Sequence, residues 1–328
     1  MVKFKEALYY KKLNDRKVHC LLCPHSCMLD NGEYGKCKVR MNINGNLKSM
    51  NYGKLHTVIS EKIEQVPFYH FMPGSNVLSV GTEGNTLSSG KLENIPTINQ
   101  TPSQLIKQAQ KLGVQAISFS KSEPTACYEY AYELADNSRK MKHIVQTNGF
   151  IESIPIAKLS GKVHGFLFDI VSMNENFYNN FLGINPEPIL KSLKRVYNNG
   201  AWVEVRMNLV QRIHEDLYDV RRIVSWMLQN LDAKVPLHFF CSRNSANPEK
   251  NFDEETAKKA RRIAMEAGLN YVYVHGLKDL NSQDAKDAGN TFCPRCKKAV
   301  IVRSDSYVES FLSDGKCSCG KEIAGVWS

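Results

Sequence analysis

Eight of the ten cysteines in this chain fall into two tight groups near its ends, and these groups constrain the fold more than any other feature. The first group is Cys20, Cys23, Cys27 and Cys37, and the second is Cys293, Cys296, Cys317 and Cys319. Clustered cysteines are typical of metal sites, whereas disulfide frameworks are typical of short secreted chains. In a chain of 328 residues, we therefore predict two metal-binding modules.

The second cysteine group predicts a zinc ribbon in residues 286–328. Cys293-Pro-Arg-Cys296 and Cys317-Ser-Cys319-Gly320 flank two strand-like segments, 299–302 and 307–311. Four thiolates in a tetrahedron are ligands that zinc prefers. A segment this small has little apolar core without a metal, so we favour a structural zinc over free surface thiols.

The first cysteine group predicts a metal module with short β structure in residues 1–70. Four thiolates match zinc and a [4Fe-4S] cluster equally well, so both cofactors stay open. His19 and His25 lie beside these cysteines, and we interpret them as neighbours of the metal rather than ligands. The two remaining cysteines, Cys127 and Cys241, lie in helix and strand patterns and are predicted to be buried packing residues.

Between the modules, in residues 71–285, apolar strand-like runs alternate with helical patterns. Strands are expected at 76–80, 116–120, 143–147, 163–169, 202–209, 237–240 and 271–274, and helices at 125–137, 153–159, 187–198, 215–230 and 253–267. A further helix opens with a capping box formed by Thr101 and Gln104. This alternation predicts an α/β fold with a parallel sheet, and we favour a partial barrel over an open doubly wound sheet. The active site is expected at the carboxyl ends of the strands.

The charge balance of the chain bears on its partners. Lys and Arg number 43 and Asp and Glu number 33, which gives a net charge of +10. Such a charge attracts nucleic acid, anionic lipid or an acidic protein. The sequence shows no run of about 18 apolar residues and no secretory signal at its start. We therefore expect a cytoplasmic protein that does not bind membranes, with RNA or another protein as a partner for its basic surface.

Several motifs along the chain carry a family resemblance. They are Cys20-Leu-Leu-Cys23-Pro-His-Ser-Cys27, Phe68-Tyr-His-Phe-Met-Pro-Gly74, Ser122-Glu-Pro-Thr-Ala-Cys-Tyr-Glu-Tyr130, Thr147-Asn-Gly149 and Cys293-Pro-Arg-Cys296. In this order and spacing, the chain resembles the radical SAM enzyme of the AmmeMemoRadiSam system, a family related to pyruvate formate-lyase activating enzymes. The resemblance implies a partial (β/α)6 barrel. It also implies a [4Fe-4S] cluster that chelates S-adenosylmethionine, on the loop after the first barrel strand.

The cluster loop departs from the family pattern. Asn85, Ser89 and Leu92 stand where the resemblance implies three cysteines in the motif C-x-x-x-C-x-x-C. Asn and Ser are weak ligands for iron and Leu is none, so we predict that these residues hold no cluster there. The resemblance also places Glu123, Asn148 and Asp169 at a site for S-adenosylmethionine. We interpret them as a vestigial site whose residues remain mainly because the fold needs them.

The sequence thus favours a divergent, metal-binding and non-radical member of the radical SAM superfamily, with catalytic residues unassigned. One alternative is an active iron-sulfur enzyme that uses a cluster at the N-terminal module. Another is a basic RNA- or ribosome-associated zinc protein. The segment from Gly84 to Leu92 weakly resembles a phosphate loop, but its spacing and the Leu after Lys91 do not match one, which leaves only simple anion capture.

Overall fold

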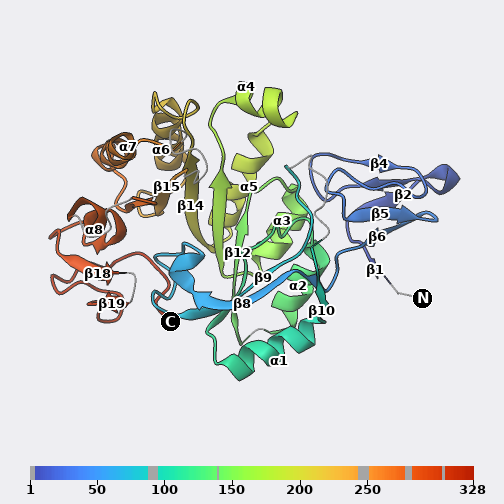
Figure 1. Cartoon of the computed structure of the whole chain (residues 1–328), viewed down its shortest axis with the longest axis horizontal. Helices are drawn as coiled ribbons and strands as arrows, with labels where there is room; N and C mark the ends of the chain where they lie inside the picture. The colour runs from blue at the N-terminus through green and yellow to red at the C-terminus, as the bar shows by residue number, and fades with distance from the viewer. Residues whose placement is uncertain (1–3, 88–94, 139, 243–250, 278–282, 305–306) are drawn as a thin grey trace. The chain divides into compact units, whose positions relative to one another are not determined.

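The computed structural model describes residues 4–87, 95–138, 140–242, 251–277, 283–304 and 307–328 (Figure 1). Contacts divide the chain into two compact units. Unit 1 comprises residues 1–62, 75–166 and 176–201, and unit 2 comprises residues 63–74, 167–175 and 202–328. Each unit is therefore assembled from three separate stretches of chain. The domains expected at 1–70, 71–285 and 286–328 stay a prediction.

The sheet of unit 1 consists of three parallel strands and one antiparallel strand. Its order is β8 (Thr57–Lys62), β9 (Asn76–Gly81), β11 (Ala116–Phe119) and β12 (Lys142–Thr147), and β8 is the antiparallel member. The helices of this unit are α1 (Pro102–Leu112), α2 (Tyr128–Asn137), α3 (Ser153–Ser160) and α5 (Glu187–Asn198). The strands and helices predicted here are confirmed within a few residues.

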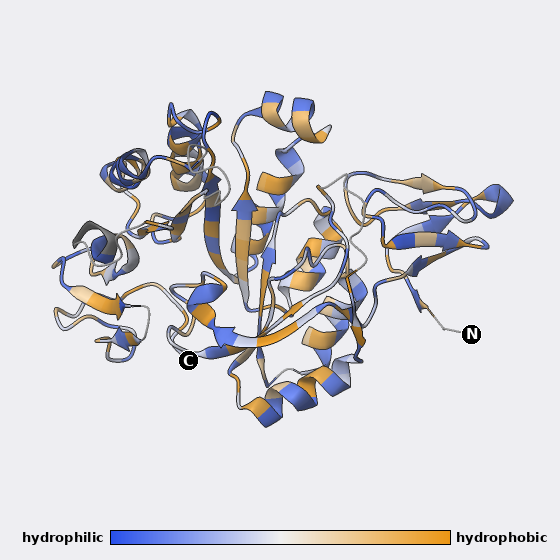
Figure 2. Ribbon diagram, viewed as in Figure 1, coloured by the Kyte–Doolittle hydropathy of each residue, from blue (hydrophilic) through white to orange (hydrophobic). Residues whose placement is uncertain are grey.

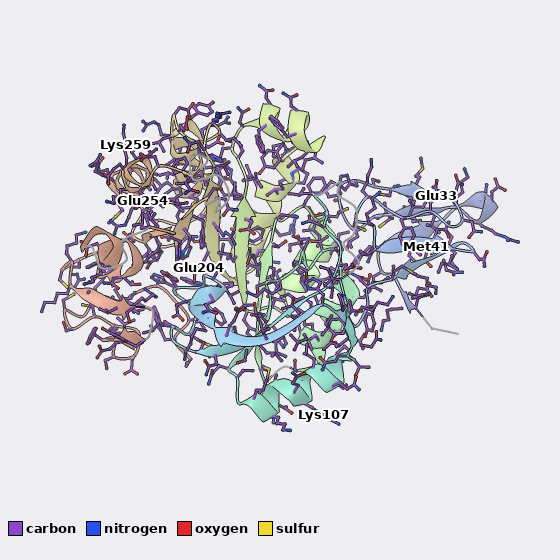
Figure 3. The ribbon with its side chains drawn as sticks, viewed as in Figure 1. Glu33, Met41, Lys107, Glu204, Glu254 and Lys259 are labelled. Carbon is purple, nitrogen blue, oxygen red and sulfur yellow. The ribbon has the colours of Figure 1, made fainter. Side chains whose placement is uncertain are left out.

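Helix α1 shows how local sequence sets these elements. The Thr101 hydroxyl accepts a hydrogen bond from the Gln104 N–H at 3.3 Å, and the Gln104 side chain accepts one from the Thr101 N–H at 2.8 Å. The predicted capping box is therefore confirmed. Leu105 is buried, whereas Lys107 points outward (Figure 3). This alternation of apolar and polar residues along α1 is visible in Figure 2.

The N-terminal part of unit 1 is built from short antiparallel strands. One sheet has the order β2 (Tyr10–Lys12), β3 (Val18–Cys20) and β4 (Met28–Leu29). A second has the order β1 (Lys5–Glu6), β6 (Asn46–Ser49) and β5 (Arg40–Ile43), and β7 (Lys54–Leu55) pairs with β10 (Ile98–Asn99). A short 3-10 turn lies at Asn14–Arg16, and another at Ile63–Gln65 begins the first stretch of unit 2. The short strands of unit 1 bury Val18, Leu29, Leu47 and Leu55.

Unit 2 contains the parallel strands β14 (Trp202–Leu209), β15 (Leu237–Cys241) and β16 (Val272–His275), with helices α6 (Tyr218–Asn230), α7 (Glu254–Glu266) and α8 (Gln283–Gly289). Strands β17 (Thr291–Phe292), β18 (Ala299–Arg303) and β19 (Val308–Ser310) form an antiparallel sheet around the C-terminal cysteines. In β14, Val205 and Met207 alternate with Glu204 and Arg206, so one face of these strands is apolar and the other is polar. That polar face carries the buried groups described below.

Strand β13 (Gly165–Ile170), helix α4 (Glu175–Phe177) and a π turn (Tyr178–Leu182) lie where the chain passes between the units. Strands β9, β11 and β12 of unit 1 are parallel to one another, as are β14, β15 and β16 of unit 2, and helices alternate with these strands along the chain. The predicted α/β class with parallel strands is confirmed within each unit. Across the part of the chain that the structure describes, every helix is too short or too polar to cross a bilayer.

Candidate metal centres

The four cysteines of the C-terminal module bring their sulfur atoms together in unit 2. The Sγ atoms of Cys293 and Cys319 lie 3.7 Å apart, those of Cys296 and Cys317 lie 3.6 Å apart, and all four lie within 4.8 Å of one another. A tetrahedral zinc ion with bonds of about 2.3 Å separates its sulfur ligands by about 3.8 Å. Donor type, number and spacing therefore fit a single metal ion.

Two tight turns aim these sulfurs at a common point. In the first, the Lys297 N–H donates to the Cys293 carbonyl at 2.9 Å. In the second, the Gly320 N–H donates to the Cys317 carbonyl at 2.8 Å, and Gly320 has a φ of +81°, which glycine adopts without steric cost. The backbone N–H of Cys319 lowers the pKa of Cys317 to about 6 and so favours its thiolate. The short Cys317-Ser-Cys319 spacing thus brings both sulfurs to one site.

In the N-terminal module, which lies in unit 1, each sulfur faces an N–H donor. Arg40 Nη1 donates to Cys20, and the backbone N–H of His25 donates to Cys23. The backbone N–H groups of Lys36 and Val39 donate to Cys27 and Cys37, respectively. Such donors stabilise a thiolate more than a thiol. Burial nevertheless raises the pKa of Cys23, Cys27 and Cys37. A bound metal would supply the positive charge that these buried thiolates need.

The N-terminal sulfurs are spread more widely than the C-terminal ones. Among the described residues, no three of them lie within 4.8 Å of one another, as the C-terminal sulfurs do. Cys23 still interacts electrostatically with the other three cysteines. The thiolates of a [4Fe-4S] cluster bind different irons, so they stand further apart than the ligands of one zinc ion. The donor set therefore fits a multinuclear cluster as well as a single ion.

A buried ion pair ties the N-terminal module to helix α2. The guanidinium of Arg40 on β5 pairs with the carboxylate of Glu129, and both side chains are about 98% buried or more. Arg40 Nη1 also donates to the Leu8 carbonyl at 3.0 Å, and the Leu8 N–H donates to Glu129 at 2.8 Å. The same Nη1 lies 3.5 Å from the sulfur of Cys20. A fixed cation therefore borders the thiolates.

His25 brings the N-terminal module to the loop that follows β9. Its Nε2 lies 2.7 Å from the carbonyl oxygen of Thr86, and its ring meets Phe150 edge-on with centroids 5.0 Å apart. The Glu152 N–H also donates to the Leu22 carbonyl at 3.0 Å. The module thus lies at the carboxyl ends of β9 and β12. His19 forms a separate hydrogen bond with Ser26, at 2.6 Å.

The loop after β9 is held by hydrogen bonds at the position where the family resemblance implies the first cluster cysteine. Asn85 Oδ1 accepts from the Leu87 N–H at 2.8 Å and from Asn148 Nδ2 at 3.3 Å. The Thr86 hydroxyl also bonds to Asn148, at 3.2 Å. Asn85 therefore acts as a turn former here. Ser89, Leu92 and the Gly90-Lys91 pair lie outside the described residues.

Glu123 and Asn148, expected at a vestigial cofactor site, are joined to each other. One Glu123 oxygen accepts from the Thr125 N–H and from the Thr147 hydroxyl, both at 2.9 Å. The other accepts from the Asn148 N–H at 2.9 Å. Glu123 is buried and its carboxylate already has three donors. These bonds tie the ends of β11 and β12 together, which supports the interpretation of both residues as parts of the fold.

Asp169, the third residue expected at that site, belongs to unit 2. Its Oδ1 lies 3.3 Å from Nε of Arg206 on β14. The Arg206 guanidinium also stacks over the Phe240 ring, 4.5 Å from its centroid. Outside the two modules, Cys127 and Cys241 are buried, so the prediction that they serve packing is confirmed.

A buried network on the polar face of unit 2 was missed by sequence reasoning. Glu204 accepts from the backbone N–H groups of Tyr69 and His70, at 3.0 and 2.9 Å, and it bonds to Nε2 of His238 at 2.7 Å. His238 Nδ1 lies 3.0 Å from Nε2 of His275. Figure 3 labels Glu204 among the side chains around β14. The signal in the sequence was polar residues at alternate positions of β14, β15 and β16.

The chain combines an α/β fold with two four-cysteine modules. No family model matches the chain. The uncharacterized protein MJ0808 of Methanocaldococcus jannaschii is 32% identical over 341 aligned residues, which cover 97% of this chain and 98% of that protein. The chain therefore belongs to the family of MJ0808.

Solved structures that match part of this chain include the following three. A domain of pyruvate-formate lyase-activating enzyme from Bacteroides vulgatus has a TM-score of 0.41 at 16% identity, over 49% of this chain and 99% of that one. SuiB of Streptococcus suis, bound to S-adenosylmethionine, has a TM-score of 0.44 at 14% identity, over 58% of this chain and 46% of that one. A radical SAM methyltransferase from Sphaerobacter thermophilus also scores 0.44 at 14% identity, over 58% and 61% of the two chains.

Proposed function

We propose that this chain is a divergent radical SAM superfamily protein that binds zinc at its C-terminal cysteines and a second metal group at its N-terminal cysteines. We propose further that it does not perform radical chemistry at the loop after β9. The sulfur spacing of 3.6 and 3.7 Å at the C-terminal module is the observation that carries the metal assignment. A zinc ion there would join the two halves of the ribbon, which is a structural role.

The loss of radical chemistry is supported by the loop after β9. Asn85 occupies the first position that a cluster cysteine would take, and its amide is engaged by Leu87 and Asn148. A carboxamide is a hard ligand and a poor partner for iron in a sulfide cluster. Without a cluster at this position, the barrel has no local donor of the electron that cleaves S-adenosylmethionine.

A second candidate function is an iron-sulfur enzyme that uses the N-terminal module. Two observations favour it. Among the described residues, the N-terminal sulfurs form no group as compact as the C-terminal set, and His25 bonds to the Thr86 carbonyl in the loop after β9. A [4Fe-4S] cluster in the module would then lie near the expected mouth of the barrel. Four cysteine ligands would leave no iron open for S-adenosylmethionine, so electron transfer is the role we propose for such a cluster.

Metal analysis of anaerobically purified protein separates the two candidates. Elemental analysis counts zinc and iron, and Mössbauer spectra identify the form of the iron. The first candidate predicts zinc in the C-terminal module and no 5′-deoxyadenosine after reconstitution with iron, sulfide and S-adenosylmethionine. Formation of 5′-deoxyadenosine by the wild type would overturn it. A [4Fe-4S] Mössbauer signal that is lost in Cys20→Ser but kept in Cys127→Ala would support the second. Iron that survives Cys20→Ser would place the cluster elsewhere and contradict both.

An RNA partner is a separate proposal, supported by exposed lysines on both cysteine modules. Lys36 and Lys38 flank Cys37, and Lys297 and Lys298 follow Cys296. Phosphate contacts make binding weaken steeply with salt. A gel shift with structured RNA that disappears as the salt concentration rises, and that weakens when Lys297 and Lys298 are changed to glutamine, would support this proposal. No shift at low salt would refute it.

A further inference from the structure

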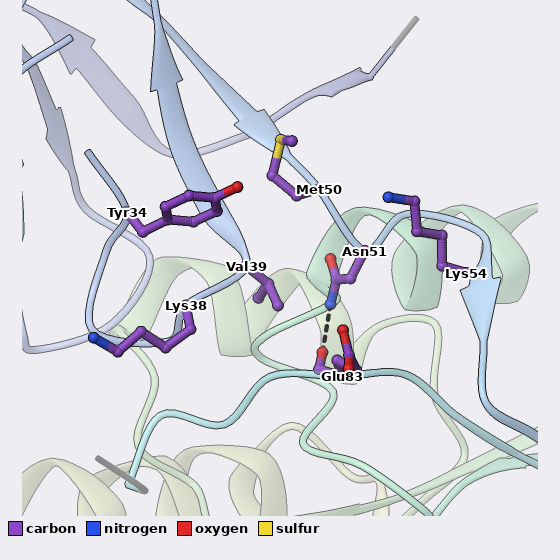
Figure 4. A pocket seen from close by; sticks show the side chains of 7 residues that line it. All are labelled: Tyr34, Lys38, Val39, Met50, Asn51, Lys54 and Glu83. Carbon is purple, nitrogen blue, oxygen red and sulfur yellow. Dashed lines mark hydrogen bonds between the residues drawn. The ribbon is translucent and has the colours of Figure 1, made fainter. Parts of the chain in front are cut away.

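A cavity of about 490 Å³ opens in unit 1 beside the N-terminal module (Figure 4). Its walls come from the segment around Tyr34 and Val39, the segment around Met50 and Lys54, and Glu83 in the loop after β9. Cavities of this size typically hold small molecules. The structural role of the cysteine modules makes no use of it.

Two opposite charges face this cavity without forming an ion pair with each other. Lys54 and Glu83 are both half-buried. Within the described ranges, the Glu83 carboxylate has no hydrogen-bonded or ion-paired partner, and the Lys54 ammonium lies 5.4 Å from the centroid of the Phe4 ring. Figure 4 shows the Tyr34 hydroxyl and the Lys54 ammonium pointing toward one another across the cavity. The ammonium of Lys38 points away from it.

The wall that carries Glu83 is held in place before any ligand arrives. Asn51 Nδ2 donates to the Glu83 carbonyl at 2.8 Å and to the Ala126 carbonyl at 3.2 Å. Next to Glu83, Gly84 packs so closely that a Cβ there would lie 2.6 Å from a methyl group of Val39. A preformed wall lowers the ordering cost of binding.

We propose that this cavity binds a molecule that carries an α-amino acid group on an apolar body. The ligand carboxylate would lie between the Lys54 ammonium and the Tyr34 hydroxyl, and its ammonium would face the Glu83 carboxylate. The apolar body would cover Val39 and Met50. Among the described residues, the half-buried Glu83 carboxylate has no charged or hydrogen-bonded partner and the Lys54 ammonium contacts an aromatic ring, so a ligand of complementary charge supplies a polar partner at both ends. This proposal does not depend on which metal the cysteines hold.

Three probes with the same phenylethyl body test the charge pattern. They are L-phenylalanine, 3-phenylpropanoate, which lacks the amino group, and 2-phenylethylamine, which lacks the carboxylate. Binding to the full chain is measured by calorimetry and by ligand-observed NMR. We expect L-phenylalanine to bind about 10-fold more tightly than either partial probe, since each charged contact contributes about 1.4 kcal/mol.

Variants locate the binding. Lys54→Met is expected to weaken L-phenylalanine and 3-phenylpropanoate about 10-fold. Glu83→Gln is expected to remove the advantage of L-phenylalanine over 3-phenylpropanoate. Lys107→Met is the matched control, because Lys107 is exposed on α1 and does not line the cavity, and it should change binding less than about twofold. Equal affinity for the three probes, absence of binding by all three, or equal effects of Lys107→Met and Lys54→Met would overturn the proposal.

Discussion

Nε2 of His238 lies 2.7 Å from the carboxylate of Glu204, and both side chains are fully buried. Burial works against ionisation of Glu204, but hydrogen bonds led by the one from His238 hold its pKa below the usual value. The ionised carboxylate accepts, so Nε2 of His238 carries the hydrogen and Nδ1 accepts from His275. The network therefore fixes one tautomer of each ring and links β14, β15 and β16.

Removing the charge of Glu204 should destabilise unit 2. In Glu204→Gln, the new NH₂ group faces either the N–H groups of Tyr69 and His238 or that of His70, so buried donors lose their acceptor. We expect a loss of about 3 kcal/mol in the free energy of unfolding. Denaturant unfolding monitored by circular dichroism measures it. Glu309→Gln, at an exposed position of β19, should cost less than about 0.5 kcal/mol; equal costs would contradict the assignment.

The buried histidines predict acid sensitivity. Burial lowers the pKa of His70 from its ordinary value of 6.5 to about 4, and it also lowers the pKa values of His238 and His275. The unfolded chain thus binds protons that the folded chain excludes. The histidine contribution to stability should be constant above pH 6.5, and stability should fall as the pH decreases from 6.5 toward 4. Thermal midpoints recorded between pH 8 and pH 4 test this, and a midpoint that rises on acidification would contradict it.

The Arg40–Glu129 pair should be needed for stability and for metal retention in the N-terminal module. Arg40→Met leaves Glu129 as an unpaired buried charge, so we expect a loss of roughly 3–5 kcal/mol. Arg40→Lys keeps a cation but not the planar fork that reaches both Glu129 and Cys20. We expect it to retain more stability than Arg40→Met but to lose metal faster to a chelator. Equal chelation rates in Arg40→Lys and the wild type would refute the link to Cys20.

The C-terminal cysteines should hold one metal ion as a unit. Cys293→Ser should lower the zinc content by about one ion per chain and lower the melting temperature, because the ribbon has little core of its own. Cys241→Ala, also in unit 2 but outside the module, should keep the zinc. Elemental analysis of both purified variants decides the matter. Full zinc retention in Cys293→Ser would show that the short spacing at Cys317 and Cys319 excludes a shared ion.

Restoring cysteines to the loop after β9 should restore an iron site. In the triple variant Asn85→Cys, Ser89→Cys and Leu92→Cys, three thiolates replace residues that bind iron poorly. Anaerobic reconstitution should then add about four irons per chain relative to the wild type, with a new spectrum of a [4Fe-4S] cluster. No additional iron would mean that the lack of thiolates at these three positions is not what keeps a cluster out of this loop.

The sequence predicted most of the regular elements because their signals are local. The capping box at Thr101 and the apolar runs of β9, β11 and β12 depend on residues close together in the chain. The C-terminal cluster of four cysteines was also predictable, since these residues come as two short pairs. In both cases, the types of residue and their spacing along the chain are enough to predict the structure.

Contacts between distant residues were not predictable in this way. Tyr69 and His70 meet Glu204 across more than 130 residues, and Arg40 meets Glu129 across 89. No sequence motif around Glu204 or Glu129 identifies the residue with which it pairs. The cavity beside Glu83 likewise depends on segments from three places in the chain. For Glu123 and Asn148, the sequence identified the residues, while the structure supplied their bonding partners.

The backbone N–H groups of Tyr69 and His70 donate to the carboxylate of Glu204. Residues 63–74 belong to the same unit as residues 202–328. During synthesis on the ribosome, this early segment must therefore wait until well over half of the chain has emerged before its partner exists. Until then its aromatic side chains are exposed to chaperones and to other nascent chains. Unit 2 therefore completes its folding late in synthesis.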